Sequence, residues 1–110
     1  MNKKAILYTR VSTDDQADRG YSLRDQEERL KRYCEIKSIS IAAIFTEDHS
    51  ARNFDRPEFK KLFKYAREHK KDIDMIVFIK WDRFSRNVSE SYRMIEEFFQ
   101  LGIEPVAIEQ

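Results

Sequence analysis

Apolar residues recur along this chain in two patterns, and these patterns predict its secondary structure. Nearly continuous apolar runs, typical of strands covered on both faces, occupy residues 4–11, 40–46, 73–79 and 103–108. Three amphipathic stretches with helical spacing lie between the runs. This alternation predicts an α/β fold: a mainly parallel sheet of four or more strands, flanked by helices and joined by right-handed crossovers.

Local signals indicate where each helix begins and ends. The first helix is expected from about Ser22, a favourable N-cap residue, and the second from Pro57, which suits a first helical turn. The third is expected to end before Gly102, at a left-handed C-cap. We interpret the apolar positions of the three helices as core-facing: Leu23, Leu30, Tyr33 and Cys34; Phe59, Leu62, Phe63 and Ala66; Tyr92, Ile95, Phe98 and Phe99.

Size and composition narrow the class of protein. A chain of 110 residues suits one domain with a single core, and its lone cysteine, Cys34, has no second cysteine for an internal disulfide. No apolar run approaches the ~18 residues of a membrane span, so we expect no membrane partner. Charged residues make up 37% of the chain while the net charge is +1, so functional charges must be identified by position.

Polar side chains gather after three of the predicted strands, where open α/β sheets bind ligands. They are Tyr8, Arg10 and Ser12 at the end of the first strand; Asp48, Ser50, Arg52 and Arg56 after the second; and Lys80, Asp82, Arg83 and Arg86 after the third. If residues 82–86 form a helical turn, the two arginines in it are neighbours, and they repel each other unless an anion lies between them. Arginine forks match phosphate oxygens, so the sequence predicts a phosphate ligand.

Each of these residues also has an ordinary explanation. Arg10 alone suits a surface ion pair, and Ser12 alone suits a turn or cap hydroxyl. Asp82 and Arg86 could form an i,i+4 pair on a helix. His49 is a candidate general base, although loop histidines are more often not catalytic. The convergence of three separate loops on one sheet edge is what favours the phosphate site.

Four motifs together resemble a known family. In order and spacing, "YTRVSTDDQ", "YSLRDQ", "EDHSARNFDRPEF" and "KWDRFSRN" resemble the catalytic domain of serine site-specific recombinases, the family of resolvases, invertases and large serine integrases. The resemblance runs from about Tyr8 to the end of the chain, and it implies a resolvase-like fold. The extra residues "ADRGY" between Gln16 and Ser22 are more similar to the large serine recombinases.

The resemblance implies a role for each matched residue. Ser12 would be the nucleophile, Arg10 and Arg56 would contact the scissile phosphate, and the catalytic group would be completed by Asp82, Arg83 and Arg86. Supporting positions would be Tyr8, Gln16, Gln26, Asp48, Ser50 and Lys80. Arg52 is a weaker candidate. The segment "SARNF", which begins at Ser50, departs from the small residues that the family usually has after this serine.

The implied reaction is transesterification without a metal or other cofactor. Ser12 would attack the phosphodiester, form a 5′-phosphoserine link and release a 3′ hydroxyl. The guanidinium groups would supply the positive charge that paired Mg²⁺ ions supply in many nucleases. The general base stays open between Asp82, the first candidate, and His49.

The resemblance also implies partners that the 110 residues do not include. Residues 1–110 would be an N-terminal catalytic domain truncated before a long dimerisation helix and a DNA-binding region. The full-length protein would bind double-stranded recombination sites as a homodimer and a synaptic homotetramer, in the cytoplasm of a bacterium or as a phage-encoded protein. The isolated fragment is expected to be inactive.

Two other functions are compatible with parts of the sequence. A flavodoxin-like receiver domain would need clustered carboxylates, which Asp14, Asp15 and Asp48 imitate only loosely, and it leaves the arginines unexplained. A catalytically silent assembly domain would not need the complete polar set. Trp81 is open to two interpretations, packing at the sheet edge or lying on DNA.

Overall fold

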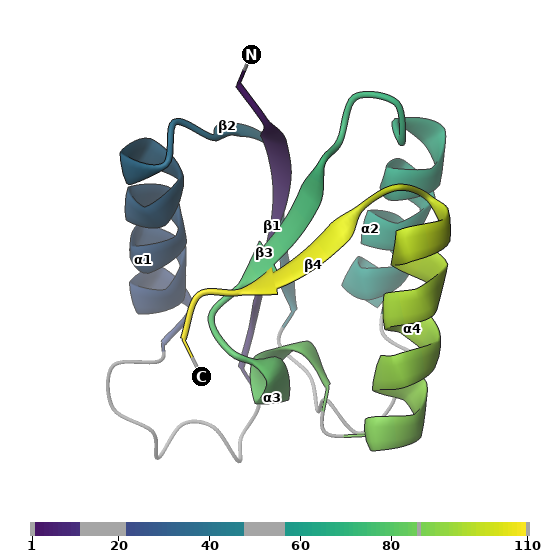
Figure 1. The fold of residues 1–110 in the computed structure, drawn as a ribbon. Coiled ribbons are helices and arrows are strands. Elements are labelled where there is room, and N and C mark those ends of the chain that lie inside the picture. The colour runs from purple at the N-terminus through teal and green to yellow at the C-terminus, as the bar shows by residue number, and fades with distance from the viewer. Residues whose placement is uncertain (1, 12–21, 48–56, 86, 110) are drawn as a thin grey trace.

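The computed structural model places four parallel strands in one sheet, in the order β2-β1-β3-β4 (Figure 1). The structure describes residues 2–11, 22–47, 57–85 and 87–109, with the backbone alone described at 82 and 83. Along the chain the elements are β1 Lys4–Arg10, α1 Leu23–Ile36, β2 Ser40–Glu47, α2 Pro57–Glu68, β3 Met75–Phe78, α3 Trp81–Phe84, α4 Val88–Gln100 and β4 Glu104–Ala107. The predicted α/β fold with a parallel sheet is confirmed.

The helices cover both faces of the sheet, with α1 on one side and α2 and α4 on the other (Figure 1). Strand residues alternate between the two sides, as the pleat requires. The side under α1 is aliphatic, formed by Ala5, Leu7, Leu30, Cys34, Met75, Val77 and Ile79. The side under α2 and α4 is rich in aromatic rings, with Tyr8, Phe59, Phe78, Phe84 and Phe98 fully or almost fully buried. We call these the aliphatic face and the aromatic face.

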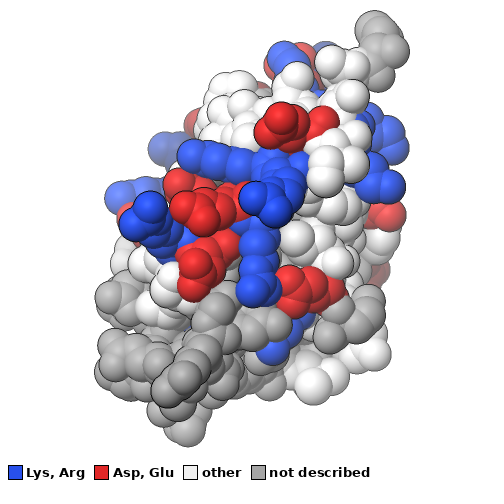
Figure 2. Space-filling model, turned by 90° about the vertical axis from the view of Figure 1, so that its left-hand side faces the viewer, with Lys and Arg blue, Asp and Glu red and all other residues white. Residues whose placement is uncertain are grey.

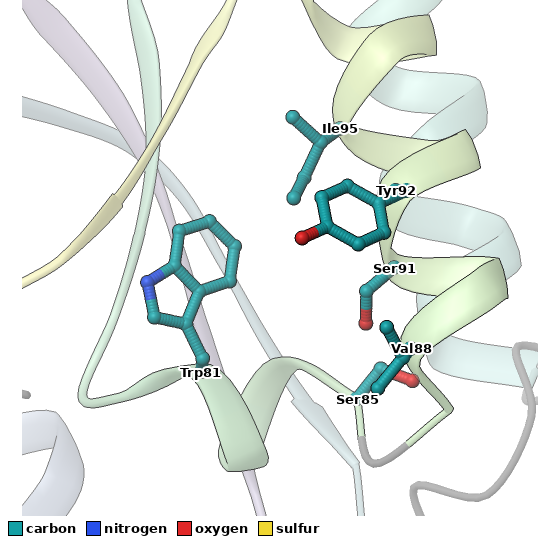
Figure 3. Close-up of a pocket in the computed structure, with 6 residues that line it drawn as sticks. All are labelled: Trp81, Ser85, Val88, Ser91, Tyr92 and Ile95. Carbon is teal, nitrogen blue, oxygen red and sulfur yellow. The ribbon is translucent and has the colours of Figure 1, made fainter.

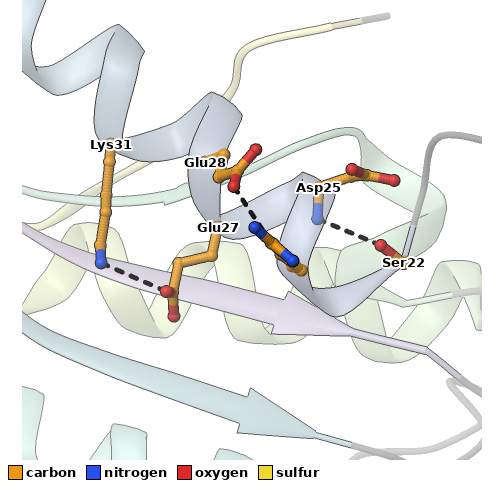
Figure 4. Close-up of polar contacts among 6 residues, drawn as sticks. Ser22, Asp25, Glu27, Glu28 and Lys31 are labelled. Atoms are coloured by element: carbon orange, nitrogen blue, oxygen red, sulfur yellow. Dashed lines mark hydrogen bonds and ion pairs between the residues drawn. The ribbon is translucent and has the colours of Figure 1, made fainter.

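Side-chain caps explain why α1 and α4 begin where they do. The Ser22 hydroxyl accepts a hydrogen bond from the Asp25 N–H at 3.1 Å, and the Asn87 side-chain carbonyl accepts one from the Glu90 N–H at 2.9 Å. Each cap satisfies one of the backbone donors that a helix leaves unpaired at its start. The predicted cap at Ser22 is therefore confirmed (Figure 4).

The outer side of α1 is charged and carries both signs. Ion pairs one turn apart join Arg24 to Glu28 at 3.3 Å and Lys31 to Glu27 at 3.2 Å. Figure 2 shows lysine and arginine side chains interleaved with acids over this side of the molecule. Such exposed pairs contribute little stability, so this face is a solvated surface.

The structure corrects the prediction for α4. Phe98 is buried as predicted and Ile95 is partly buried, but Tyr92 is 71% exposed and Phe99 is 58% exposed. Met94 takes the second buried position instead. The core-facing stripe is therefore narrower than the apolar pattern indicated, and the rest of the apolar surface faces outwards.

Element boundaries differ from the predictions by a few residues, and the helix-start signal at Pro57 and the helix-end signal at Gly102 are both confirmed. α2 begins at Pro57, and Gly102 has a φ of 80°, the left-handed conformation predicted after the third amphipathic helix. The short α3 is an additional element within the segment where a helical turn was considered. Among the described residues, no helix has the length and apolar character needed to cross a bilayer.

Candidate active site

Strand order places the candidate site between β1 and β3. The chain leaves β1 towards β2 on one side, whereas β3 lies on the other side of β1 and leads on to β4. Connections that depart in opposite directions open a crevice at the carboxyl ends of the two strands, and doubly wound folds bind ligands there. Arg10 is the last residue of β1, and Lys80 precedes α3, which lies against both strands.

Arg10 is held by a neighbouring helix. The side-chain amide of Gln26, in α1, accepts a hydrogen bond from the Arg10 N–H at 3.2 Å and donates one to the Arg10 carbonyl at 2.9 Å. Both residues are completely buried. Gln26 therefore satisfies both backbone groups of Arg10 at the point where the strand ends, and it fixes the direction in which the chain continues.

Glu47 is a candidate site residue that the sequence reasoning missed. It is the last residue of β2, it is 1% exposed, and it stands opposite Arg10 in the register of the two strands. Its Oε1 accepts a hydrogen bond from the Phe59 N–H at 2.9 Å, in the first turn of α2. A carboxylate at this position satisfies an unpaired helix donor and complements the helix dipole.

A sequence signal for Glu47 was present. Phe45 packs against the aromatic core, and the two-residue period of a strand turns Glu47 to the same side. An acid at such an inward position needs a buried partner, because an isolated charge is costly to bury. Asp48, the acid predicted instead, lies outside the described residues.

Tyr8 and Lys80 lie at the same end of the sheet as Arg10. Tyr8 is fully buried and packs edge-on against Phe59, with ring centroids 5.5 Å apart. Lys80 is half-buried, with an extended backbone at the N-cap position of α3. Tyr8 therefore joins the site to the aromatic core, and Lys80 carries a cation to the end of the adjacent strand.

The structure brings together part of the predicted set. The carboxyl ends of β1 and β3 hold Arg10, Gln26, Tyr8 and Lys80, and the backbone of α3 places Asp82 and Arg83 at the same end of the sheet. The predicted residues that lie outside the described part are Ser12, Gln16, Asp48, Ser50, Arg56 and Arg86, together with His49 and Arg52.

An apolar groove of about 390 Å³ adjoins α3. It lies between α3 and α4 and is lined by Trp81, Ser85, Val88, Ser91, Tyr92 and Ile95 (Figure 3). Trp81 packs edge-on against Phe78 at 4.9 Å and remains 37% exposed. The ring of Trp81 thus packs at the sheet edge, as one interpretation predicted, and the other interpretation, that it lies on DNA, stays a prediction.

Other polar groups of the described chain do not form a competing centre. Cys34 is buried in the aliphatic face, and burial raises the pKa of its thiol, which keeps it in the unreactive protonated form. Within the described residues, no three His, Cys, Asp or Glu side chains are grouped as metal ligands.

Comparisons with known proteins agree with this architecture. The family described as "Resolvase, N terminal domain" matches residues 5–110. The N-terminal catalytic domain of TP901-1 integrase has a similar structure, with a TM-score of 0.86 and 30% identity over 96% of this chain and 78% of that chain. The chain belongs to the resolvase family and has the fold of a serine recombinase catalytic domain.

Two curated relatives set the scale of the similarity. An uncharacterized immunity region protein 3 of Bacillus phage phi105 is 34% identical over 67 residues, covering 60% of this chain and 82% of the relative. The Tn501 resolvase of Pseudomonas aeruginosa is 26% identical over 103 residues, covering 94% of this chain and 46% of the relative. The chain thus spans about half the length of the transposon resolvase.

Proposed function

We propose that this chain is the catalytic domain of a serine recombinase that cuts and rejoins double-stranded DNA at specific sites. The observation that carries the proposal is the placement of Arg10: a buried guanidinium at the switch point of the sheet, on a backbone clamped by Gln26 and two residues before Ser12. The family membership supports the same reaction class.

The proposed chemistry consists of two phosphoryl transfers, one that cleaves the DNA strand and one that rejoins it. The Ser12 oxygen bonds to phosphorus as the bond from phosphorus to the 3′ oxygen breaks. The strand is left with a free 3′ hydroxyl, and the protein is linked to the 5′ phosphate. The serine proton passes to a base, for which Asp82 is the first candidate and His49 the second, and a 3′ hydroxyl of the new partner reverses the step.

Guanidinium groups supply the charge stabilisation in this proposal. Arg10, Arg56, Arg83 and Arg86 would neutralise the charge that develops on the phosphate oxygens, and these groups stay protonated at any physiological pH. We assign supporting roles to Tyr8, Gln16, Gln26, Asp48, Ser50 and Lys80. We add Glu47 to this set because its side chain accepts a hydrogen bond from the first turn of α2.

The assembly and setting follow from the substrate. Cutting and exchanging two duplexes requires four active sites, so we propose a homodimer on each site and a homotetramer in the synapse. We further propose that these 110 residues act within a larger protein that supplies the DNA-binding surface, in the DNA-containing cytoplasm of a bacterium or a phage-infected cell.

A covalent-adduct assay tests the proposed function. Residues 1–110 would replace the matched half of the Tn501 resolvase, and the chimaera would be incubated in EDTA with the recombination site of that resolvase. We expect a denaturation-resistant protein–DNA adduct on the 5′ phosphate that disappears with Ser12→Ala. Residues 1–110 alone should give none.

Three outcomes would contradict the proposal. An adduct that persists in Ser12→Ala would exclude Ser12 as the nucleophile. An absolute need for Mg²⁺ would exclude charge stabilisation by guanidinium groups alone. Phosphate transfer from a small phosphodonor to an aspartate, with no DNA adduct, would favour the receiver domain.

A further inference from the structure

A second candidate site lies between α2 and α4, the two helices that cover the aromatic face. It is a groove of about 370 Å³ lined by Phe59, Lys60, Phe63, Arg67, Arg93 and Met94, and we call it the α2–α4 groove. Three of these six residues are cations and none is an acid. None belongs to the set proposed for recombination.

The floor of the groove is apolar and preformed. The Phe63 ring packs edge-on against Phe98 with centroids 5.2 Å apart, and Phe59 packs against the same ring at 6.3 Å. Phe59 and Met94 are buried, whereas Phe63 is only partly covered. Because packing already holds these side chains, a ligand that contacts them has little ordering entropy to overcome.

The rim of the groove is positive. The guanidinium carbon of Arg67 lies 5.2 Å from the Phe63 ring centroid, a cation–π distance that keeps the charge over the floor. Neither Arg67 nor Arg93 forms an ion pair within the described part of the chain. This holds although α4 carries acids three and four positions from Arg93, namely Glu90, Glu96 and Glu97.

The α1 side of the molecule differs from the groove. There, Arg24, Arg29 and Lys31 each pair with a carboxylate, and Figure 2 shows both signs of charge mixed over the surface. At the α2–α4 groove, two arginines without an acidic partner among the described residues border an apolar floor. This combination complements a ligand that offers both carboxylates and an apolar side chain.

We propose that the α2–α4 groove docks an acidic segment of a partner protein. The segment seats an aliphatic or aromatic side chain on Phe63 and Met94, and flanking carboxylates pair with Arg67 and Arg93. A DNA backbone fits less well, because phosphates and sugars provide no apolar side chain for the floor. The proposal does not depend on recombination chemistry, and either one stands if the other fails.

The test uses residues 1–110 and three synthetic peptides at ~0.15 M salt, where long-range charge effects are screened. The first peptide alternates glutamates with leucine and phenylalanine. In the second, glutamine replaces every glutamate, and in the third, serine replaces the apolar residues. Binding is followed by the NMR shift of the labelled Met94 methyl group and by the dissociation constant.

We expect the first peptide to shift the Met94 methyl signal, and both control peptides to bind at least about tenfold more weakly, since each lacks one half of the complement. The charge reversal Arg67→Glu with Arg93→Glu should weaken the first peptide by a similar factor. The matched reversal Lys64→Glu with Arg32→Glu changes the net charge equally but lies outside the groove, and it should leave the dissociation constant within about twofold.

Several results would overturn the proposal. The first is a Met94 methyl signal that does not shift at a saturating concentration of the first peptide. The second is equal weakening of peptide binding by the groove reversal and the control reversal. The third is a serine-substituted peptide that binds as tightly as the first peptide. A double-stranded oligonucleotide that shifts Met94 more strongly than the peptide would assign the groove to nucleic acid instead. If the double reversal impairs folding, Arg67→Gln with Arg93→Gln makes the same comparison without added repulsion.

Discussion

The two faces of the sheet differ in their cores, yet each contributes one buried polar side chain at the site. On the aliphatic face, Leu30 of α1 packs with Leu7 and Val77 of the sheet, and α1 also supplies Gln26. On the aromatic face, Phe59 of α2 packs edge to face against Phe98 of α4, and Glu47 binds the first turn of α2. The comparison teaches that apolar packing supplies stability, while buried polar side chains fix the elements beside the candidate site: Gln26 binds the end of β1, and Glu47 binds the start of α2.

The largest effect is expected from breaking the aromatic face. Phe98→Ala removes a buried ring that contacts Phe59, Phe63 and Phe84, and should lower the free energy of unfolding by about 3–5 kcal/mol. The neighbouring Phe99→Ala should change it by less than about 0.5 kcal/mol, because that ring is mostly exposed. Urea unfolding measures both, and equal losses would mean that Phe99 is covered in solution.

A smaller loss is expected where the aliphatic face meets the site. Gln26→Leu keeps the approximate shape but removes the two hydrogen bonds that Gln26 makes with the buried N–H and carbonyl of Arg10, at a cost of about 3 kcal/mol. In this variant the Arg10 amide should exchange with solvent faster than it does in wild type, whereas the mid-strand amide of Leu7 should change less. Exchange measured by NMR in wild type and variant checks this, and an unchanged Arg10 rate would refute the clamp.

The corresponding contact on the aromatic face is expected to be worth somewhat less. Glu47→Ala removes the hydrogen bond that the Glu47 carboxylate accepts from the buried Phe59 N–H and should cost about 2 kcal/mol. Glu47→Gln retains an acceptor for that N–H and should lose less than the alanine variant. Thermal unfolding of the pair decides, and identical losses would show that the charge of Glu47, not its hydrogen bond, matters.

The smallest effect compares the helix caps on the two faces. Ser22→Ala on α1 and Asn87→Ala on α4 each remove one capping hydrogen bond, and each should lower the free energy of unfolding by about 1 kcal/mol. Denaturant titrations give both values. A loss several times larger for one cap would show that its helix start is coupled to the site rather than only to the solvent.

Much of the fold could be predicted because its signals are local. The apolar runs marked the strands, Ser22 and Pro57 marked helix starts, and Gly102 has the left-handed φ that was expected of it. Arg10 and Lys80 were placed correctly at strand ends, since the end of a strand can be recognised where apolar residues give way to polar ones.

Other features depended on neighbours that no local pattern names. The apolar spacing of α4 did not distinguish buried Phe98 from exposed Tyr92 and Phe99, because the spacing does not reveal how much of a helix its neighbours cover. The strand period indicated that Glu47 points inwards, but it did not reveal the partner, the Phe59 N–H twelve positions away, that makes Glu47 a candidate site residue.

By itself, the sequence determined the alternation of strands and helices, the caps and the set of polar residues at the strand ends, since each depends on a few adjacent side chains. Tertiary structure alone decided the order β2-β1-β3-β4, which opens the site between β1 and β3, and the burial of Arg10 with Gln26 and Glu47. Those features depend on which distant segments pack together, and packing is settled by the whole core at once.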